Sequence, residues 1–286
     1  MFVIEEVETF LAIARSGSLT QAARIVHASQ STVSYRLDCL EKRLGQTLVL
    51  RARGTKGIGL TPAGRRYLDL AEQWEHLVGE AARIRSDRQA ALSVGSSDAI
   101  NIYLFDTLIT RLLERSPRLH LTLETGRGGE LCDRVVSGHL DVAFVFYEPF
   151  HTDLHVRVLA RYPMVAVFRE LDPGSAVSLT RLADGDEIYL PWGPDYDLWR
   201  ERHLLGEPAH IVTRAHSLAP VLRAPGTWAL VPAFMVADLV AKTGCRTAPV
   251  TEEPPERTVY WVERKRRRAA NAAALQVMEE VLAELF

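Results

Sequence analysis

The sequence predicts an α/β protein with an all-α, winged module at its amino-terminal end. Apolar residues recur at helical spacing over residues 4–45, and a helical pattern then runs over residues 61–87 with Gly79 as its one breaker. From residue 91 onwards, short strand patterns alternate with helices, as in a doubly wound α/β domain. A chain of 286 residues is too long for one small core, so more than one domain is expected.

Three short helices are predicted in residues 4–45, with a tight turn between the second and the third. Ser18 and Gln21 have the spacing of a capping box at the start of the second helix. Ser29 is placed to cap the third helix, and Gly45 is placed to end it. The third helix carries one apolar stripe and a polar opposite face.

The polar face of the third helix suits the major groove of DNA. Amide and hydroxyl side chains can reach base edges there, whereas arginine and hydroxyl groups also hold phosphates. An ordinary helical hairpin with a solvated face has the same pattern, so the pattern alone leaves both interpretations open. The residues expected to contact DNA are Thr20, Gln30, Ser31, Thr32, Ser34, Tyr35 and Arg36.

Residues 46–60 predict a two-stranded wing after the third helix. Residues 48–50 and 58–60 would form its strands, with a glycine-containing tip between them. Cations at such a tip meet the sugar-phosphate backbone or a minor groove, although a solvated loop is the alternative. The cations expected to do so are Arg51, Arg53 and Lys56.

The distribution of charge sets the amino-terminal module apart from the rest of the chain. Residues 16–66 hold nine Lys or Arg and two Asp or Glu, which gives +7. The whole chain has 34 basic and 36 acidic residues, so everything outside that window sums to −9. A basic module on an acidic body fits phosphate binding by one end only.

Residues 61–87 predict one long helix, with Thr61 as its N-cap and Pro62 in its first turn. At ~1.5 Å per residue this helix is roughly 40 Å long. Its apolar residues recur at near-heptad spacing, which favours dimerisation, although the protein's own body could cover them. A dimer would place the third helix of each subunit on one of two half-sites of DNA. The residues of this stripe are Tyr67, Leu70, Ala71, Trp74, Leu77, Val78, Ala81 and Ile84.

The α/β body is predicted to consist of two lobes joined by two crossover strands. The first lobe is expected to contain strands at 92–95, 119–123 and 140–144, helices at 100–114 and 130–137, and a closing helix at 269–285. The crossovers are expected at 158–168 and 259–263, and the strands of the second lobe at 187–192, 211–214 and 228–231.

Ligands of open α/β sheets bind beyond the carboxyl ends of the strands. Ser97 at a helix start could hold a carboxylate, and the aromatic residues could enclose an apolar or ring portion. Alternatively, Ser97 is a plain N-cap and the aromatic residues are packing; Asp98 also weakens the carboxylate hypothesis. An organic acid or an aromatic effector is expected. The residues expected at strand ends are Ser96, Ser97, Thr125, Gly126, Phe146, Tyr147, Trp192 and His216.

Several functional classes find little support. The chain has no Gly-x-Ser-x-Gly elbow, no His-Glu-x-x-His and no phosphate loop, so neither an enzyme nor a cofactor is predicted. Cys39, Cys132 and Cys245 are too far apart to indicate a disulfide framework or a metal site. No apolar run approaches the roughly 18 residues of a membrane span. The first residues lack a signal peptide's pattern, so a cytoplasmic protein is expected.

One set of amino-terminal motifs recurs in register over about sixty residues: Phe10-Leu11, Ala22-Ala23, Gln30, Ser34, Leu40-Glu41, Leu44-Gly45, Arg51, Leu60-Thr61 and Gly64. This set resembles the signature of the LysR-type transcriptional regulators. Two departures are Ser31, where a proline is usual, and Val49, where a phenylalanine is usual. Later in the chain, 138–144 resembles a strand entry of the same family, whereas 225–227 replaces a paired-glycine segment.

The resemblance implies a winged helix-turn-helix DNA-binding domain at 1–60, a linker helix for dimerisation at 61–90 and an effector-binding domain at 91–286. It implies a periplasmic-binding-protein-like fold for that last domain, with lobe I at about 91–162 and 264–286 and lobe II at about 163–263. The basic run 264–268 follows a strand and opens a helix far from the DNA-binding helices, so a solvated or oligomer-contact face is expected there, with a second DNA contact as the alternative.

The function implied is a regulator controlled by a small-molecule effector bound between the two lobes. The expected partners are an interrupted palindrome of double-stranded DNA, RNA polymerase and further copies of the chain in a homodimer or homotetramer. A thiol or redox sensor of the same fold, acting through Cys132 or Cys245, is the alternative. An enzyme or a solute-binding protein is a more remote alternative.

Overall fold

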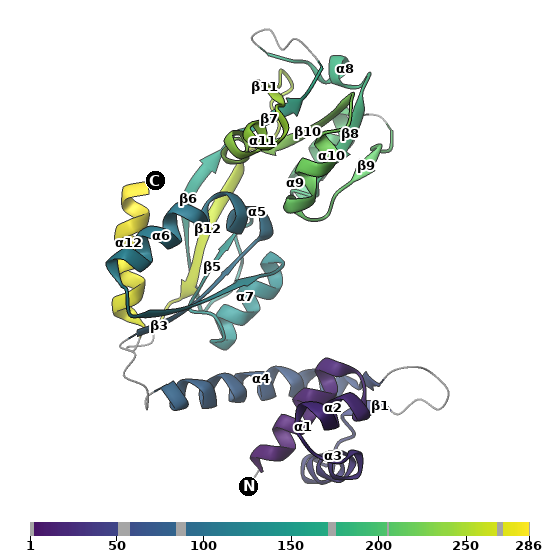
Figure 1. Ribbon diagram of the computed structural model, residues 1–286, viewed down its shortest axis with the longest axis vertical. Helices are drawn as coiled ribbons and strands as arrows, with labels where there is room; N and C mark the ends of the chain where they lie inside the picture. The colour runs from purple at the N-terminus through teal and green to yellow at the C-terminus, as the bar shows by residue number, and fades with distance from the viewer. Residues whose placement is uncertain are drawn as a thin grey trace. The chain divides into compact units, whose positions relative to one another are not determined.

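The computed structural model of the chain describes residues 3–50, 58–83, 90–170, 176–204, 206–267 and 271–285. The chain divides into two compact units, Met1–Asp87 and Arg88–Phe286 (Figure 1). The tip of the predicted wing, with Arg51, Arg53 and Lys56, and the last residue of the apolar stripe, Ile84, lie outside the described residues.

The amino-terminal unit has the predicted helices and wing strands. Its elements are α1 (Ile4–Ser16), α2 (Leu19–Ile25), α3 (Gln30–Leu44), β1 (Val49–Leu50), β2 (Gly59–Leu60) and α4 (Pro62–Arg83). The two strands pair antiparallel, with Val49 opposite Leu60. Phe10 of α1 is fully buried and meets Tyr67 of α4 edge to face, with ring centroids 5.1 Å apart. The first turns of α4 therefore belong to the core of this unit.

Side-chain caps set the helix boundaries that the sequence predicted. The hydroxyl of Ser18 accepts a hydrogen bond from the Gln21 backbone N–H at 3.4 Å, and that of Ser29 accepts one from Thr32 at 3.1 Å. Gly45 ends α3 in the left-handed region at φ 64°. These contacts confirm the predicted positions of the helix-turn-helix caps.

Glu41 and Gly64 fix the start of the wing against α3 and α4. The Glu41 Oε1 atom accepts hydrogen bonds from the backbone N–H groups of Leu48 at 2.7 Å and Val49 at 3.1 Å. A Cβ atom at Gly64 would lie 2.0 Å from the Leu48 carbonyl oxygen, so only glycine fits there. Val49 is 3% exposed, so the smaller side chain at this position is still packed in the core.

Lobe I of the carboxy-terminal unit is a five-stranded mixed sheet in the order β4-β3-β5-β12-β6. β3 runs parallel to β4 and β5, whereas β12 is antiparallel to β5 and β6. The strands are β3 (Ala90–Ser96), β4 (Leu119–Thr125), β5 (Val142–Val145), β6 (Leu154–Tyr162) and β12 (Arg257–Arg264).

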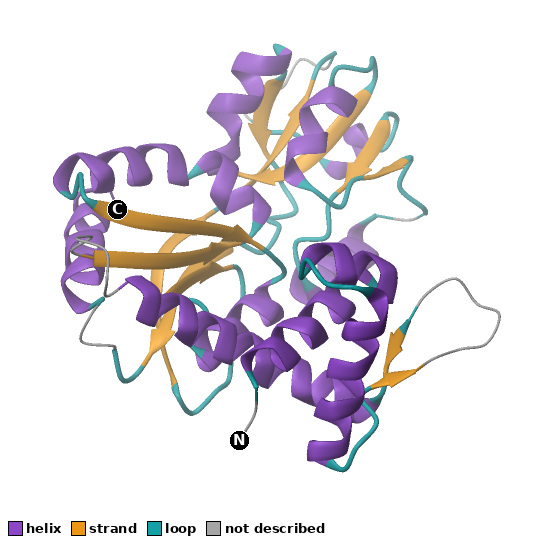
Figure 2. Ribbon diagram, turned by 60° about the horizontal axis from the view of Figure 1, so that its bottom comes forward, coloured by secondary structure: helices purple, strands orange, loops and turns teal. Residues whose placement is uncertain are grey.

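Helices cover both faces of the lobe I sheet (Figure 2). Alternate residues of β5 point to opposite faces: Val142 and Phe144 pack against α6 and α12, and Ala143 and Val145 pack against α7. The helices of this lobe are α5 (Asp98–Tyr103), α6 (Phe105–Arg115), α7 (Gly128–Ser137) and α12 (Ala272–Leu285).

Lobe II is a second five-stranded sheet, in the order β11-β7-β10-β8-β9. Its strands are β7 (Met164–Phe168), β8 (Asp186–Tyr189), β9 (His210–Ile211), β10 (Thr227–Pro232) and β11 (Arg246–Pro249). Its helices are α8 (Leu179–Leu182), α9 (Pro194–His203), α10 (Leu218–Leu222) and α11 (Val236–Thr243), with 3-10 turns at η1 (Ala215–Ser217) and η2 (Ala233–Met235). The two lobes confirm the predicted fold class.

Two predicted elements are divided in the structure. The first crossover is two strands, β6 in lobe I and β7 in lobe II, because Pro163 between them has no N–H to continue a ladder. The helix predicted at 100–114 is α5 and α6, which meet at Leu104. The chain returns to lobe I between β11 and β12.

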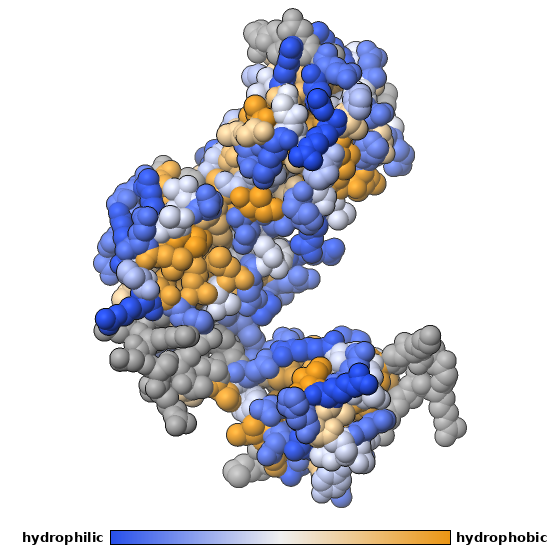
Figure 3. All heavy atoms as spheres, viewed as in Figure 1, coloured by the Kyte–Doolittle hydropathy of each residue, from blue (hydrophilic) through white to orange (hydrophobic). Residues whose placement is uncertain are grey.

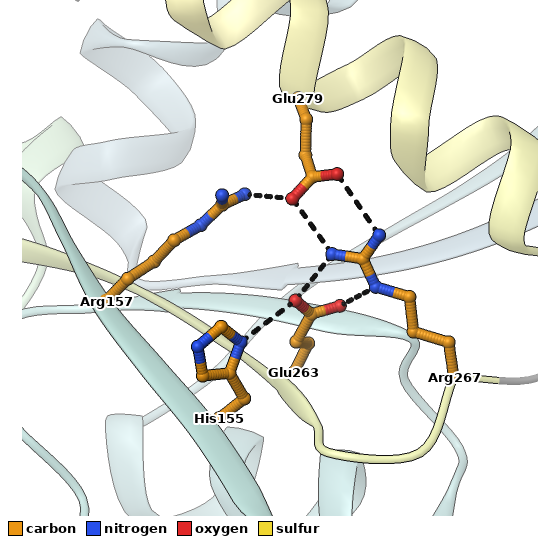
Figure 4. A network of polar contacts seen from close by, with 5 residues as sticks. All are labelled: His155, Arg157, Glu263, Arg267 and Glu279. Atoms are coloured by element: carbon orange, nitrogen blue, oxygen red, sulfur yellow. Dashed lines mark hydrogen bonds and ion pairs between the residues drawn. The ribbon is translucent and has the colours of Figure 1, made fainter.

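A network of charges joins β12 to α12 around a buried carboxylate (Figure 4). Glu263 is 1% exposed and accepts hydrogen bonds from the Arg267 Nε and Nη2 atoms, both at 2.7 Å. Arg267 also donates to Glu279 at 2.8 Å, and Glu279 pairs with Arg157 at 2.7 Å. The Arg267 guanidinium, at 32% exposure, thus neutralises two glutamates of the same lobe.

Candidate functional site

One face of α3 is buried and the opposite face is open to solvent. Val33, Leu37 and Leu40 are fully buried. Of the residues predicted to contact DNA, Thr20, Gln30, Ser31 and Tyr35 are exposed, and Thr32, Ser34 and Arg36 are partly buried. All seven lie on α2 or α3, and a hydrogen bond of 3.4 Å from the Thr20 hydroxyl to the Gln30 side chain joins the two helix starts.

Neighbouring side chains occupy some of the donors on this face. The Ser29 hydroxyl lies 2.7 Å from that of Ser31 and 2.8 Å from that of Thr32, so these three groups form a cluster at the N-terminus of α3. A side-chain hydrogen bond with Cys39 raises the pKa of Tyr35. The Tyr35 side chain is 69% exposed, and its phenol could donate a hydrogen bond to a base or a phosphate only by leaving Cys39.

Ion pairs hold α1 against the neighbouring helices. Glu6 on α1 is 5% exposed and pairs with Arg43 of α3 at 3.2 Å. Arg15 of α1 donates two hydrogen bonds to Glu75 of α4, at 2.9 and 2.6 Å. These ion pairs link α1 to both α3 and α4.

The apolar stripe of α4 is only partly covered by the amino-terminal unit itself. Ala71 is buried and Tyr67 and Trp74 are partly buried, whereas Leu70 and Leu77 are 59% and 54% exposed. Hydrophobic side chains thus reach the surface of this unit (Figure 3). A groove of about 280 Å³ with apolar walls lies beside the stripe. It is lined by Val3, Ile4, Val7, Leu44, Tyr67, Leu70, Ala71 and Trp74.

A cleft of about 620 Å³ separates the two lobes of the carboxy-terminal unit. Its walls are residues 97–99, 126–128 and 146 of lobe I and residues 190–192 and 212–215 of lobe II. Four residues predicted to bind the effector line it, namely Ser97, Gly126, Phe146 and Trp192. The other four, Ser96, Thr125, Tyr147 and His216, are not among its lining residues.

Local contacts explain why two of these residues lie elsewhere. Ser96 is fully buried, and its hydroxyl accepts a hydrogen bond from the Asn101 side chain at 3.3 Å. The Tyr147 ring packs behind the start of α7, where a Cβ atom at Gly128 would come within 2.4 Å of it. Side chains alternate between the two faces of a strand. The rule that ligands bind beyond the carboxyl ends of strands, called the strand-end rule below, therefore selects positions in the chain but does not say whether a side chain points into the cleft.

Ser97 holds the N-cap position of α5 without acting as a cap. Its side chain makes no capping hydrogen bond. The Oγ atom is buried, and it has no hydrogen-bond partner among the described residues. A buried hydroxyl without a partner is energetically costly, so the Ser97 side chain contributes no stabilising hydrogen bond at this position.

The aromatic residues of the cleft are anchored by their own contacts. Phe146 meets the Trp192 ring edge to face at 6.0 Å and stacks on Phe234 at 6.2 Å. The Trp192 Nε1 atom donates a hydrogen bond of 2.9 Å to the Leu230 carbonyl oxygen. Trp192 is only 7% exposed, so it offers the cleft a small, rigid apolar surface.

Asp98 and Arg257 tie the walls of the cleft together. The Asp98 Oδ2 atom of lobe I accepts a hydrogen bond of 2.6 Å from the Ala215 backbone N–H of lobe II. Arg257, 2% exposed at the start of β12, donates to the Trp192 carbonyl oxygen at 2.6 Å and pairs with Asp195. Burial alone would raise the pKa of Asp195, but the Arg257 guanidinium lowers it.

Sequence reasoning missed Arg127 and Arg214 among the cleft residues. Arg127 directly precedes α7 in lobe I, and Arg214 directly precedes η1 in lobe II. Both follow strands by a few residues, and Arg127 also lies within a run of glycines, 126–129. That glycine run is the one sequence signal that could have drawn attention to Arg127.

The cysteines are not arranged as a thiol sensor requires. Cys132 and Cys245 are 5% and 3% exposed, and burial raises the pKa of the Cys132 thiol. A redox-active cysteine needs an accessible thiolate, which both features disfavour. Within the described ranges, no three His, Cys, Asp or Glu side chains are grouped as a metal site would require. None of the described helices is long and apolar enough to cross a membrane.

Comparison with known proteins places both units in one family. The family model described as LysR substrate binding domain matches residues 85–285. The model described as bacterial regulatory helix-turn-helix protein, lysR family, matches residues 4–65. Because the first model alone covers more than half of the chain, the chain belongs to the LysR family.

Curated relatives carry names of the same kind. The HTH-type transcriptional regulator YofA of Bacillus velezensis is 32% identical over 168 residues, which is 58% of this chain and 55% of that protein. The HTH-type transcriptional activator CmpR of Synechocystis is 28% identical over 188 residues, which is 63% of this chain and 61% of that protein. The chain thus spans little more than half the length of these relatives.

Solved structures share the fold over nearly the whole chain. CbnR, a LysR family transcriptional regulator, superposes with a TM-score of 0.76 at 19% identity, covering 98% of this chain and 99% of CbnR. A full-length OxyR variant from Pseudomonas aeruginosa gives a TM-score of 0.64 at 22% identity, covering 99% and 95%. At these identities the likeness concerns the fold alone.

Proposed function

We propose that this protein is a sequence-specific, DNA-binding transcriptional regulator whose activity is controlled by a small effector bound between the two lobes. The observation that carries the proposal is α3, which has a buried apolar stripe, a side-chain cap and an exposed polar face, in a module whose residues 16–66 carry a net charge of +7. This module matches the lysR helix-turn-helix family model, and the relatives are named as transcriptional regulators.

The proposed partners follow from the two units. The amino-terminal unit binds an interrupted palindrome of double-stranded DNA in the cytoplasm, where bacterial DNA lies. CbnR, which shares the fold, has been solved in complex with its target DNA. The effector is a small organic acid or an aromatic compound, and its binding shifts the arrangement of the DNA-binding modules and their contact with RNA polymerase. Such a shift requires that the effector bind one arrangement more tightly than the other. No catalytic role is proposed.

Selection of bound duplexes from a random pool tests the DNA-binding role. The full-length protein is expected to enrich an interrupted palindrome. The double variant Gln30→Ala/Ser34→Ala should lose about tenfold or more in affinity for the selected duplex, because it removes base-edge contacts. The matched control is Gln46→Ala, an exposed glutamine just beyond α3, which should bind like the wild type. Enrichment of no sequence, or equal loss in the control, would contradict the proposal.

Dimerisation through α4 gives a second prediction. Leu70 is 59% exposed beside the apolar groove, so Leu70→Glu should disturb the fold of one subunit little and place a charge in the proposed dimer interface. Light scattering of the full-length protein is expected to show a dimer or tetramer for the wild type and smaller species for the variant. Asp69→Asn, at the neighbouring exposed position, is the control and should leave the mass unchanged. A wild-type monomer, or a variant that keeps the wild-type mass, would refute this interface.

A further inference from the structure

Helix α5 contributes side chains to the cores of both lobes. It follows β3 of lobe I and lies between the lobe I sheet and lobe II (Figure 1). Ala99 is buried in the core of lobe II, and Ile102 and Tyr103, three and four residues later, pack against the same core. Ile100 is fully buried in the core of lobe I. The two lobes therefore meet at α5, which belongs to neither crossover.

The first residue of α5 accepts a hydrogen bond from the backbone of lobe II. The Asp98 Oδ2 atom lies 2.6 Å from the Ala215 nitrogen, at the start of η1. The same oxygen lies 3.8 Å from the Nδ1 atom of His216. The Asp98 side chain is 22% exposed and Ala215 is 5% exposed, so water competes little for this bond. A hydrogen bond to a carboxylate is stronger than one between neutral groups, so this contact holds the lobes to each other.

The aromatic ring of Phe234 adds an apolar contact beside α5. Phe234 lies in η2 of lobe II, and its ring centroid is 6.5 Å from that of Tyr103. Phe146 stacks on the same ring at 6.2 Å, and Tyr162 at the end of β6 meets it edge to face at 4.8 Å. Three rings of lobe I thus gather around one ring of lobe II.

The apolar surface that α5 itself buries against lobe II is small. Ala99 contributes a single methyl group, and Ile102 and Tyr103 remain partly exposed. The free energy gained from apolar contacts scales with the area removed from water, so this surface contributes modestly. Loss of the Asp98 hydrogen bond should therefore weaken the contact between the lobes more than loss of any one apolar contact of α5.

A break in the chain direction separates α5 from the helix that follows. Leu104 ends α5 and opens α6, with φ −115° and ψ −26°. Helix α6 buries Phe105, Leu108 and Leu112 in the core of lobe I. The break at Leu104 lets α5 stay with lobe II or leave it while α6 keeps its place on the lobe I sheet.

We propose that α5 is a clasp between the lobes and that Asp98 fastens it. The clasp holds the lobes together without a ligand, and they part only when the Asp98 carboxylate releases the Ala215 N–H. An effector then regulates the protein by favouring the fastened or the released arrangement. In this respect the inference rests on the proposed function and specifies how the effector-binding unit is regulated.

Thiol labelling of the full-length protein with N-ethylmaleimide tests the clasp. Ala99→Cys places a thiol at a position that is 4% exposed between the lobes. Cys132 of lobe I and Cys245 of lobe II, 5% and 3% exposed, are internal references because each reacts only when its own lobe opens. Peptide mapping gives the labelling rate at each thiol. The introduced thiol should react as slowly as the two references.

Adding Asp98→Ala should raise the labelling rate at position 99 about tenfold or more, because a hydrogen bond to a charged group is lost. The rates at Cys132 and Cys245 should stay unchanged, since neither lobe unfolds. Asp98→Asn keeps an oxygen acceptor without the charge and should give an intermediate rate. The matched control is Asp106→Ala, which removes an exposed carboxylate from the first turn of α6 and should leave all three rates unchanged.

Four labelling results would overturn the inference: rapid labelling at position 99 with Asp98 in place, no acceleration by Asp98→Ala, equal acceleration at the two reference cysteines, or the same acceleration in Asp106→Ala. Hydrogen exchange of Asp98→Ala without the added cysteine is a second readout. Exchange should quicken at 99–103 and 215–217 and stay unchanged at 92–95 and 228–231. Unchanged exchange at 99–103 would also overturn the inference.

A DNA mobility shift on the same samples separates this inference from the proposed function. Sequence-specific DNA binding together with unchanged labelling in Asp98→Ala defeats the inference alone. Loss of sequence-specific DNA binding in the wild type defeats the proposed function, whatever the labelling rates are.

Discussion

Replacing Gly64 by alanine is expected to destabilise the amino-terminal unit and weaken DNA binding. The added Cβ atom would lie 2.0 Å from the Leu48 carbonyl oxygen, which is backbone and cannot move aside without displacing β1. Overpacking typically costs about 1 to 3 kcal/mol, and a clash with backbone places this variant at the upper end of that range. Because β1 and β2 form the base of the wing, DNA affinity should fall by about tenfold or more even where the unit stays folded.

Gly59→Ala is the matched control for this prediction, because Gly59 lies in the same wing. The nearest atom to its added Cβ would be Leu50 Cδ1 at 3.8 Å, an ordinary van der Waals contact. Chemical denaturation and fluorescence anisotropy on one DNA duplex should place this control close to the wild type. If Gly64→Ala behaves like Gly59→Ala in both measurements, Gly64 is not what fixes the wing against α4.

Replacing Arg267 by methionine is expected to destabilise lobe I strongly. Among the residues that the structure describes, the Glu263 carboxylate, 1% exposed, would keep the His155 Nδ1 atom at 3.4 Å as its one possible cationic partner. Breaking a buried ion pair by removing one partner costs about 3 to 5 kcal/mol. The double variant Glu263→Gln/Arg267→Met should recover part of that loss, because it also removes the buried charge.

Arg115→Met is the control, since Arg115 pairs with Glu284 on the exposed surface and such pairs contribute at most about 1 kcal/mol.

Hydrogen bonding to Arg267 also lowers the pKa of Glu279 below its ordinary value of 4.5. The stability that Glu279 contributes is therefore present above pH 4.5 and lost as the pH falls through its lower, folded-state pKa. The free energy of unfolding is measured by chemical denaturation at neutral pH and at acid pH. If Arg267→Met loses no more stability than Arg115→Met at neutral pH, the network contributes little. The same follows if Arg267→Met loses as much stability as the wild type when the pH falls.

The amino-terminal unit could be predicted from sequence because its signals are local. Ser18, Ser29 and Gly45 act at the helix ends where their residue types are favoured. Glu41 and Gly64 came only from the family resemblance. Their physical reasons, a carboxylate that accepts two wing N–H groups and a contact too close for a Cβ atom, depend on tertiary structure.

The effector cleft could be predicted only in part, because it is assembled from distant segments. The strand-end rule selected Ser97, Gly126 and Phe146, which follow β3, β4 and β5 of lobe I. In lobe II the strand predicted at 211–214 is β9 at His210–Ile211, so its end was predicted too late in the chain and the rule selected His216 beyond the wall at 212–215. Arg214 was therefore missed, and so were the short helices α8 to α11.

The same contacts suggest how the cleft transmits a signal. Asp98 joins the two lobes directly, and Arg257 joins the returning strand β12 to the wall at Trp192. The coupling between ligand and DNA then depends on how differently the ligand binds the open and closed arrangements.

The most direct test of the account is the affinity of the full-length protein for its selected duplex and for a scrambled duplex across a salt series. Both affinities should fall with similar slopes as salt rises, because phosphate contacts release counterions whatever the sequence. The selected duplex should bind about a thousandfold more tightly throughout, as base-edge contacts predict. Equal affinity for the two duplexes at every salt concentration, or binding that salt does not weaken, would contradict the assignment of α3 as a reading helix.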